Sequence, residues 1–135
     1  MQNRMELHFS SCPQNESFAR VAIAAFAVQL NPTLPEMADI KTAVSEAVTN
    51  AIVHGYRDQE GMVSLCAEYG DRRLLTVRVH DDGNERSGMG FCVMQTFMDA
   101  VEVESAVGKG TTVTMRKYIT GEVGLHRERM LDEIG

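Results

Sequence analysis

Two polar residues one helical turn apart carry the strongest chemical signal in this sequence. Glu46 and Asn50 lie four positions apart in the run from Glu46 to Tyr56, so on a helix they share a face. An amide oxygen at Asn50 suits Mg²⁺, which prefers oxygen ligands and keeps several waters. A carboxylate at Glu46 can take a proton from an attacking hydroxyl. Taken alone, however, such a pair is more often an ordinary polar pair on a solvated helix face.

A carboxylate at the end of a predicted strand is the second candidate for chemistry. Asp81-Asp82-Gly83 follows a run of alternating apolar residues, and an aspartate placed there can accept a hydrogen bond from an exocyclic amino group such as that of adenine. Asp and Gly also favour turns, so a plain strand-to-loop turn is the simpler interpretation of these three residues by themselves.

Two glycine-containing segments complete the set. Gly88-Met89-Gly90 precedes a predicted helix, where glycines let backbone N–H groups approach an anion and the helix N-terminus favours negative charge. The segment from Gly108 to Thr111 lies between two predicted strands and is compatible with a simple hairpin turn. Neither segment is specific alone. The order of the four signals, each on the expected type of element, is what favours a nucleotide site.

Apolar spacing predicts the first elements that must position these residues. Met5, Leu7 and Phe9 alternate with polar residues, which is the period of a half-buried strand. Asn15 can then cap a helix whose predicted core face is Phe18, Val21, Ala22, Ala25, Phe26 and Leu30. Because this helix is also apolar on its other sides, we expect it to pack against the core and against a second subunit.

A capping box begins the next helix. Thr33 is its N-cap and Glu36 reaches back, and the helix runs to about His54 with Gly55 as its stop. Its predicted core stripe is Met37, Ile40, Val44, Ala47, Val48, Ala51 and Ile52. This helix carries both Glu46 and Asn50.

The second half of the chain predicts strands at 62–69 and 74–80, a short helix after 87–90, and strands at 100–106 and 111–119. The order strand, helix, helix, strand, strand, helix, strand, strand predicts an α/β (α+β) two-layer sandwich with helices on one face of a mixed sheet. We expect residues 1–120 to form the domain and 121–135 a polar tail.

The composition is that of one globular domain. The chain has 135 residues, of which 44% are hydrophobic and 24% charged, and its net charge of −6 argues against a primary nucleic-acid binder. The residues up to Phe9 lack the apolar core of a signal peptide, and the apolar run from Val21 to Val28 is too short to span a bilayer. Three widely spaced cysteines suit neither a metal site nor a disulfide framework, so we expect a cytoplasmic protein.

Together the four signals resemble the ATPase family that groups DNA gyrase, the Hsp90 chaperone, histidine kinases and the mismatch-repair protein MutL. The matching positions are Glu46 to Asn50 for its N box, Asp81 and Gly83 for part of its first glycine box, Gly88 and Gly90 for its second, and Gly110-Thr111 for its third element. Neither that family nor this chain has a P-loop. The resemblance implies a Bergerat-type ATP-binding fold.

The same resemblance implies a role for each residue of the site. Asp81 recognises the adenine of ATP, with Gly83 beside it and with Thr111 in support through its hydroxyl or a bridging water. Asn50 holds the Mg²⁺ that bridges the phosphates, and the two glycines of the second box donate backbone N–H groups. Glu46 orients or deprotonates the hydroxyl that attacks the γ-phosphoryl group.

Three segments, 15–21, 45–52 and 85–91, are similar to the anti-sigma F branch of that family, and the likeness runs from about Met5 to Ile119. It implies a cytoplasmic homodimer that inhibits a sporulation sigma factor and phosphorylates a serine of a small anti-anti-sigma protein. On this resemblance Arg20 contacts a partner or phosphate, whereas its position off the predicted core face is equally that of a solvated arginine.

The junction between the two glycine boxes departs from that family, which carries an ATP lid of roughly twenty residues there. Here Gly83 and Gly88 are five positions apart, and Asn84 directly follows Gly83. Either the lid is deleted, or a stretch is missing from the sequence and the numbering has been closed up. Consecutive Cα atoms much more than 3.8 Å apart between Asp82 and Ser87 would reveal a missing stretch.

Other functions stay open on the sequence alone. A nucleotide-dependent module could hold a sigma factor without turnover, although Glu46 favours an enzyme because pure binding needs no base. A stress-response anti-sigma B type kinase shares the same boxes. A histidine-kinase catalytic domain is disfavoured, since the chain has neither a phosphoacceptor helix nor a sensor segment.

Overall fold

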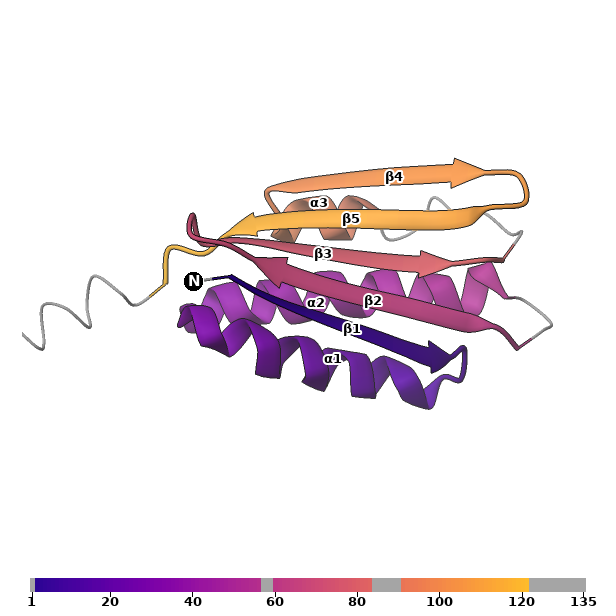
Figure 1. Ribbon diagram of the computed structural model, residues 1–135, viewed down its shortest axis with the longest axis horizontal. Helices are drawn as coiled ribbons and strands as arrows, with labels where there is room; N and C mark the ends of the chain where they lie inside the picture. The colour runs from indigo at the N-terminus through magenta and orange to yellow at the C-terminus, as the bar shows by residue number, and fades with distance from the viewer. Residues whose placement is uncertain (1, 57–59, 84–90, 122–135) are drawn as a thin grey trace, which may run out of the picture.

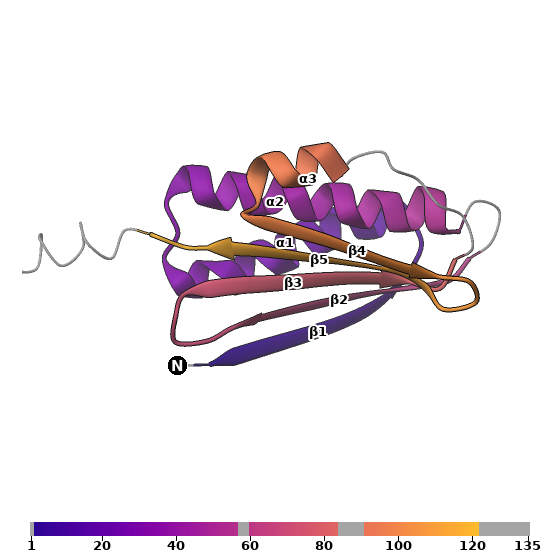
Figure 2. The ribbon, with the colours of Figure 1, turned by 90° about the horizontal axis from the view of Figure 1, so that it is seen from above.

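In the computed structural model the chain forms two layers, a five-stranded sheet and a layer of helices on one of its faces (Figure 1, Figure 2). The structure describes residues 2–56, 60–83 and 91–121. The strands are β1 (Asn3–Ser10), β2 (Met62–Tyr69), β3 (Leu74–Asp81), β4 (Ala100–Ala106) and β5 (Gly110–Tyr118). The helices are α1 (Gln14–Ala27), the 3₁₀-helix η1 (Val28–Leu30), α2 (Leu34–Asn50), the π-helix η2 (Ala51–Gly55) and α3 (Phe91–Phe97). The expected two-layer sandwich is confirmed.

The sheet has the strand order β1-β2-β3-β5-β4, and all four of its pairings are antiparallel. The expectation of a mixed sheet is therefore corrected. Two helices connect β1 to β2 and return the chain so that β2 runs opposite to β1. Helix α3 connects β3 to β4, which gives these two strands the same direction, but β5 pairs between them and keeps each pairing antiparallel.

The central helix α2 packs against both α1 and α3 and supplies much of the core. Its predicted core stripe is confirmed: all seven residues are buried or pack against the buried cluster, from Met37 to Ile52. The strands contribute residues at alternate positions, such as Val63, Leu65 and Ala67 on β2, because a strand projects every second side chain toward the helices.

The buried face of α1 overlaps only partly with the predicted one, since Phe26 and, on η1, Leu30 are buried as expected. Its buried residues are Ala19, Ile23, Phe26 and Ala27. Phe18 and Val21, which the sequence places in the core, are 50% and 67% exposed. Both faces of α1 carry apolar residues at helical spacing, so periodicity could not choose between them. Asn15 does not cap the helix either, because its side-chain amide donates to the carbonyl oxygen of Ser10 (2.8 Å).

The capping box that begins α2 is confirmed. Thr33 Oγ1 accepts a hydrogen bond from Glu36 N (3.2 Å), and Glu36 Oε1 accepts one from Thr33 N (2.9 Å). The helical segment runs to Gly55 as expected, but its last five residues form the π-helix η2. Such wider helical turns are rare in proteins, and those that occur often lie at functional sites.

Glu36 also fastens the end of the sheet to the start of α2. Its carboxylate accepts hydrogen bonds from Thr120 N, Thr120 Oγ1 and Gly121 N, each 2.9 Å long. Partial burial raises the pKa of Glu36, but these bonds together with that from Thr33 outweigh it and lower the pKa from 4.5 to about 2. One carboxylate therefore holds the helix start and the chain beyond β5 together.

We expect Glu36→Gln to lower the free energy of unfolding by about 1–3 kcal/mol near neutral pH, because an amide cannot accept all of these bonds. The depressed pKa means that the carboxylate stabilises the fold fully above about pH 4.5 and loses this effect as the pH falls toward 2. Urea unfolding across this range should therefore depend less on pH in the variant than in the wild type.

Glu102→Gln is the control for this measurement, because it removes only an exposed partner of Arg116 (3.0 Å). Its expected effect on the free energy of unfolding is below about 1 kcal/mol. Equal stabilities of wild type and Glu36→Gln near neutral pH would contradict the role given to this carboxylate.

Candidate functional site

Asp81 lies buried at the end of β3, where Gly55 and Gly83 lie close to its carboxylate and Gly110 lies close to its main chain. Asp81 is 6% exposed, and its Oδ1 accepts a hydrogen bond from Gly83 N (3.0 Å). A Cβ atom on Gly55 would lie 2.6 Å from this oxygen, and one on Gly110 would lie 1.9 Å from the Asp81 carbonyl oxygen. A Cβ atom on Gly83 would overlap the Gly55 carbonyl group. Only glycine fits at these three positions, which we call the glycine cage (Gly55, Gly83 and Gly110).

The strand register places two hydroxyl groups in line with this carboxylate. Asp81 on β3 pairs with Thr111 on β5, and Thr111 pairs with Ser105 on β4. Directly opposite residues project from the same face of a sheet, so the three polar side chains form one row on the helix side. Thr111 Oγ1 and Ser105 Oγ lie 2.9 Å apart in a hydrogen bond.

The helix that carries Glu46 and Asn50 ends at the glycine cage. Asn50 is the last residue of α2, and η2 continues the chain five residues to Gly55, beside Asp81. At no more than 1.5 Å per residue, Asn50 lies within about 7.5 Å of Gly55 along the helix axis, and Glu46 lies one turn farther. Both side chains are half-buried. The end of α2, the end of β3 and the β4–β5 turn meet at the same end of the molecule (Figure 1).

The structure thus brings together the predicted residues Asp81, Gly83 and Thr111, and it directs the helix of Glu46 and Asn50 to the same place. It adds two residues that the motifs did not indicate. Gly55 was interpreted only as a helix stop, although it also contacts the Asp81 carboxylate. Ser105 has no local sequence signal, since only the pairing of β4 with β5 reveals its position.

Two predicted site residues, Gly88 and Gly90, lie outside the described residues. The test of Cα spacing between Asp82 and Ser87 also falls largely on that segment, 84–90. The first described element after it, α3, packs against α2.

Arg20 is not part of this constellation. It lies on α1, which packs against β1, β2 and α2, and its guanidinium pairs with the carboxylate of Glu16 one turn earlier (3.3 Å). Arg20 is exposed. Its contact with a partner or phosphate stays a prediction, and the pair with Glu16 is equally that of a solvated arginine.

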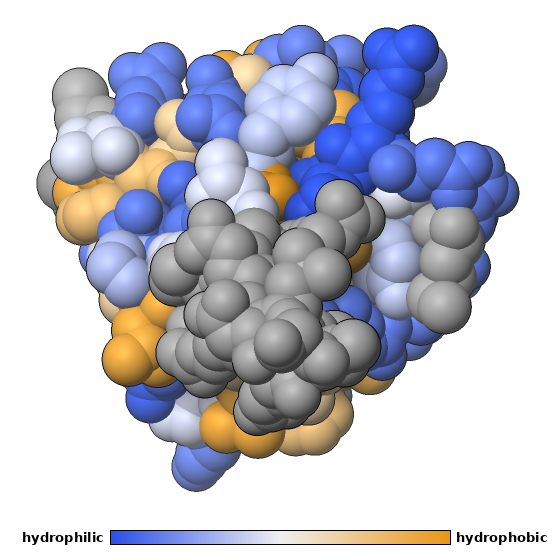
Figure 3. Space-filling view, turned by 90° about the vertical axis from the view of Figure 1, so that its left-hand side faces the viewer, coloured by the Kyte–Doolittle hydropathy of each residue, from blue (hydrophilic) through white to orange (hydrophobic). Residues whose placement is uncertain are grey.

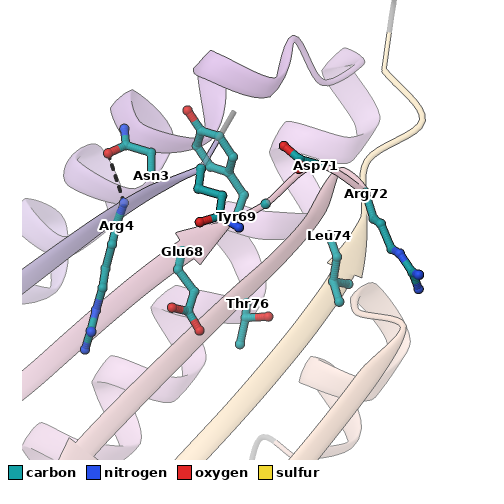
Figure 4. Close-up of a pocket in the computed structure, with 10 residues that line it drawn as sticks. Asn3, Arg4, Glu68, Tyr69, Asp71, Arg72, Leu74 and Thr76 are labelled. Atoms are coloured by element: carbon teal, nitrogen blue, oxygen red, sulfur yellow. Dashed lines mark hydrogen bonds between the residues drawn. The ribbon is translucent and has the colours of Figure 1, made fainter.

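A separate open hollow of about 630 Å³ lies at the opposite end of the sheet, around the β2–β3 turn (Figure 4). A view onto that end shows hydrophilic residues mainly at the upper right and hydrophobic residues mainly along the left and lower edges (Figure 3). Two of the charged side chains of the hollow bond to neighbours on the sheet, Arg4 to Glu6 (2.7 Å) and Glu68 to Arg78 (3.0 Å). The hollow lies about eight strand residues from Asp81 and takes no part in the candidate site.

Known proteins show which family has this arrangement. The profile of the histidine kinase-like ATPase domain matches residues 9–117. Anti-sigma F factors from Thermoanaerobacter sp. (strain X514) and from Caldanaerobacter subterraneus subsp. tengcongensis are each 52% identical over 136 aligned positions, which cover 87% of this chain and 94% of each relative. The chain belongs to the anti-sigma F factor family. An anti-sigma F factor from Clostridium acetobutylicum is 49% identical with the same coverage.

A solved structure confirms the fold independently of close sequence similarity. The chain superposes with a TM-score of 0.75 on the crystal structure of the RsbU and RsbW domains of a Mycobacterium tuberculosis protein, at 19% identity. The match covers 87% of this chain but 32% of that structure. The fold expected from the sequence is thereby confirmed, and the relatives described above confirm the family resemblance.

The residues present fit an adenine nucleotide. A carboxylate within the glycine cage offers an acceptor, and the missing Cβ atoms leave the surrounding backbone close to it. Within the described residues no group of three or more His, Cys, Asp or Glu side chains could hold a metal ion. Separately, none of the helices described has the length and apolarity that crossing a membrane requires.

We expect Asp81→Asn to weaken ATP binding more than tenfold, because the amide turns a donor toward the adenine amino group. A lost charge-assisted hydrogen bond corresponds to about 1.5–3 kcal/mol. Isothermal titration calorimetry measures the change. Asp82→Asn is the matched control, since the Asp82 side chain is exposed and pairs with His80 (2.8 Å). Unchanged affinity in Asp81→Asn would remove Asp81 from the site.

Proposed function

We propose that the chain is an ATP-dependent protein serine kinase and anti-sigma factor. It binds and inhibits a sporulation sigma factor and phosphorylates a serine of its anti-anti-sigma partner. The observation that carries this proposal is the buried Asp81 carboxylate in the glycine cage, at the end of the helix with Glu46 and Asn50. The sigma-factor partner is suggested by relatives named anti-sigma F factor that align over 94% of their length.

In this proposal some residues of the site bind the nucleotide and its metal ion, and others take part in the reaction. Asp81 accepts a hydrogen bond from the adenine amino group, and Thr111, held by Ser105, supports it. Asn50 would hold Mg²⁺, which neutralises phosphate charge when bound. Gly88 and Gly90 belong to the proposed phosphate-binding segment, although they lie outside the described residues.

The proposed reaction is an in-line phosphoryl transfer. The serine hydroxyl oxygen of the partner forms a bond to the γ-phosphorus of ATP while the bond from that phosphorus to the bridging oxygen of ADP breaks. Glu46 orients the hydroxyl and accepts its proton. Most of the rate enhancement would come from positioning and charge neutralisation, as in other phosphoryl transfers.

A second candidate function, nucleotide-dependent binding of a sigma factor without turnover, is favoured by the length of the chain. The alignment with the Thermoanaerobacter relative spans 136 positions, yet 87% of 135 residues is about 117, so about nineteen positions are filled in the relative alone. Only four residues separate Gly83 from Gly88. If the absent positions are those of a lid, nothing covers the phosphates. The chain would then lose catalysis and keep nucleotide binding.

We expect Glu46→Gln to keep nucleotide binding and to lose phosphoryl transfer by about 10²–10⁴-fold, the usual contribution of a general base. The assay incubates the chain with γ-labelled ATP, Mg²⁺ and the anti-anti-sigma partner. Glu68→Gln, on the open face of the sheet, is the control. Wild-type rates in Glu46→Gln would exclude Glu46 as the base, whereas sigma-factor binding by a wild type without any transfer would favour the module without turnover.

The proposal includes a homodimer in the cytoplasm, and the outer face of α1 is its best candidate surface. Phe18, Val21 and Val28 are 50%, 67% and 55% exposed, and with Ala25 they recur at positions i, i+3, i+7 and i+10. We call these four residues, three on α1 and Val28 at the start of η1, the outer stripe of α1. A stripe with this spacing reads the same in both directions, so it can pack antiparallel on its own copy, with Phe18 against Val28 and Val21 against Ala25.

We expect Val21→Glu to convert the dimer to a monomer, because a carboxylate would be buried at the centre of the stripe. Light scattering across a range of concentrations measures the mass. Val107→Glu is the control, since Val107 is fully exposed on the β4–β5 turn. A second variant, Arg20→Glu, should weaken partner binding and leave the dimer intact. A monomeric wild type, together with unchanged partner binding by Arg20→Glu, would contradict both roles of this helix.

A further inference from the structure

Tyr56 joins two segments that border the candidate site. It follows directly after Gly55, and its hydroxyl donates a hydrogen bond to the carbonyl oxygen of Met62 at the start of β2 (2.8 Å). The same oxygen accepts a hydrogen bond from the backbone N–H of Asp82 (2.7 Å). One phenol therefore connects the helix end, the first residue of β2 and the turn after β3.

The bond to Asp82 acts at the centre of the site. Asp82 lies between Asp81, which carries the buried carboxylate, and Gly83, whose N–H donates to that carboxylate (3.0 Å). Gly83 in turn packs against the backbone of Gly55, the residue before Tyr56. The Asp82 N–H lies in the peptide plane shared with Asp81, and the next peptide plane joins Asp82 to Gly83, so a shift at Asp82 would move both neighbours. The position of the Asp81 carboxylate thus depends on the hydroxyl of Tyr56.

The phenol is held in one place. Its ring packs against Gly61, where a Cβ atom would lie 2.2 Å from the ring. The ring can therefore occupy this position only because residue 61 is glycine. Tyr56 is half-buried and packs against the core cluster. Burial raises the pKa of Tyr56, so the hydroxyl keeps the proton that it donates to Met62.

We propose that Tyr56 is a positioning residue for nucleotide binding, which acts by fixing the turn Asp81-Asp82-Gly83 through the backbone of Asp82. This inference rests on the proposed function, because it assumes that Asp81 binds the nucleotide. Tyr56 itself need not touch the ligand. A purely structural tyrosine would change stability alone, whereas a positioning residue changes nucleotide affinity in a protein that remains folded.

The test compares Tyr56→Phe with Tyr69→Phe by calorimetric titration of Mg-ATP and by exchange of the Asp82 amide with solvent. Tyr69 is the matched control, since its hydroxyl also donates a hydrogen bond, to Gln29 Oε1 (2.7 Å), but it lies at the other end of β2. We expect Tyr56→Phe to weaken binding about threefold to tenfold, as lost hydrogen bonds of this kind do, and to speed exchange at Asp82. Tyr69→Phe should bind as the wild type does.

Gly61→Ala provides a second variant, because it displaces the ring without removing the hydroxyl, and it should weaken binding in the same direction. Wild-type affinity in both Tyr56→Phe and Gly61→Ala, with faster exchange at Asp82, would overturn the inference and leave the proposed function standing. A wild-type chain that binds no Mg-ATP would overturn the proposed function and this inference together, and the wild-type titration alone reveals that outcome.

Discussion

The candidate site depends on one constraint. The buried carboxylate of Asp81 must lie in close contact with backbone that carries no side chain. Placing an ionised group in a protein interior costs several kcal/mol unless hydrogen bonds compensate. At Asp81 part of this compensation comes from the N–H of Gly83, and the carboxylate lies against Gly55. Any side chain on the glycine cage would separate these segments. The carboxylate therefore keeps its position only while the end of β3, the start of β5 and the end of η2 meet.

The two-layer fold supplies this convergence. Helix α2 crosses the sheet from the capping box at Thr33 to the π-helix that ends at Gly55. Different contacts hold its two ends. At the start, the carboxylate of Glu36 accepts three hydrogen bonds from the chain beyond β5 and one from Thr33 N at the N-cap. At the end, Tyr56 fastens the turn after β3. Rigid attachment at both ends allows one helix to present polar side chains to a fixed point.

Much of this fold could be predicted from local sequence signals. The capping box, the alternation along β1 and the stripe of α2 each involve neighbouring residues whose chemistry decides the structure. The buried face of α1 could not be predicted, because Phe18 and Ile23 belong to two apolar faces and only packing against α2 selects one. The antiparallel sheet was missed because the insertion of β5 between β3 and β4 is a long-range choice.

The site shows the same division between local and long-range information. Motif spacing indicated Asp81 and Thr111 separately, and the register of β3 with β5 makes them direct partners. Ser105 and the contact of Gly55 with the Asp81 carboxylate depend on elements far apart in the sequence, so no local pattern could reveal them. Residues 84–90 lie outside the described residues, and the roles of Gly88 and Gly90 stay predictions.

The central claim is that Mg-ATP binds where α2, β3 and β5 converge. Titration of Mg-ATP into the isotope-labelled protein, followed by backbone amide chemical shifts, tests it most directly. The predicted result is saturable shifts at Gly55, at 81–83 and at 110–111, with no change around the distant β2–β3 turn. Shifts confined to that turn and its hollow, or no shifts at any concentration, would contradict the claim.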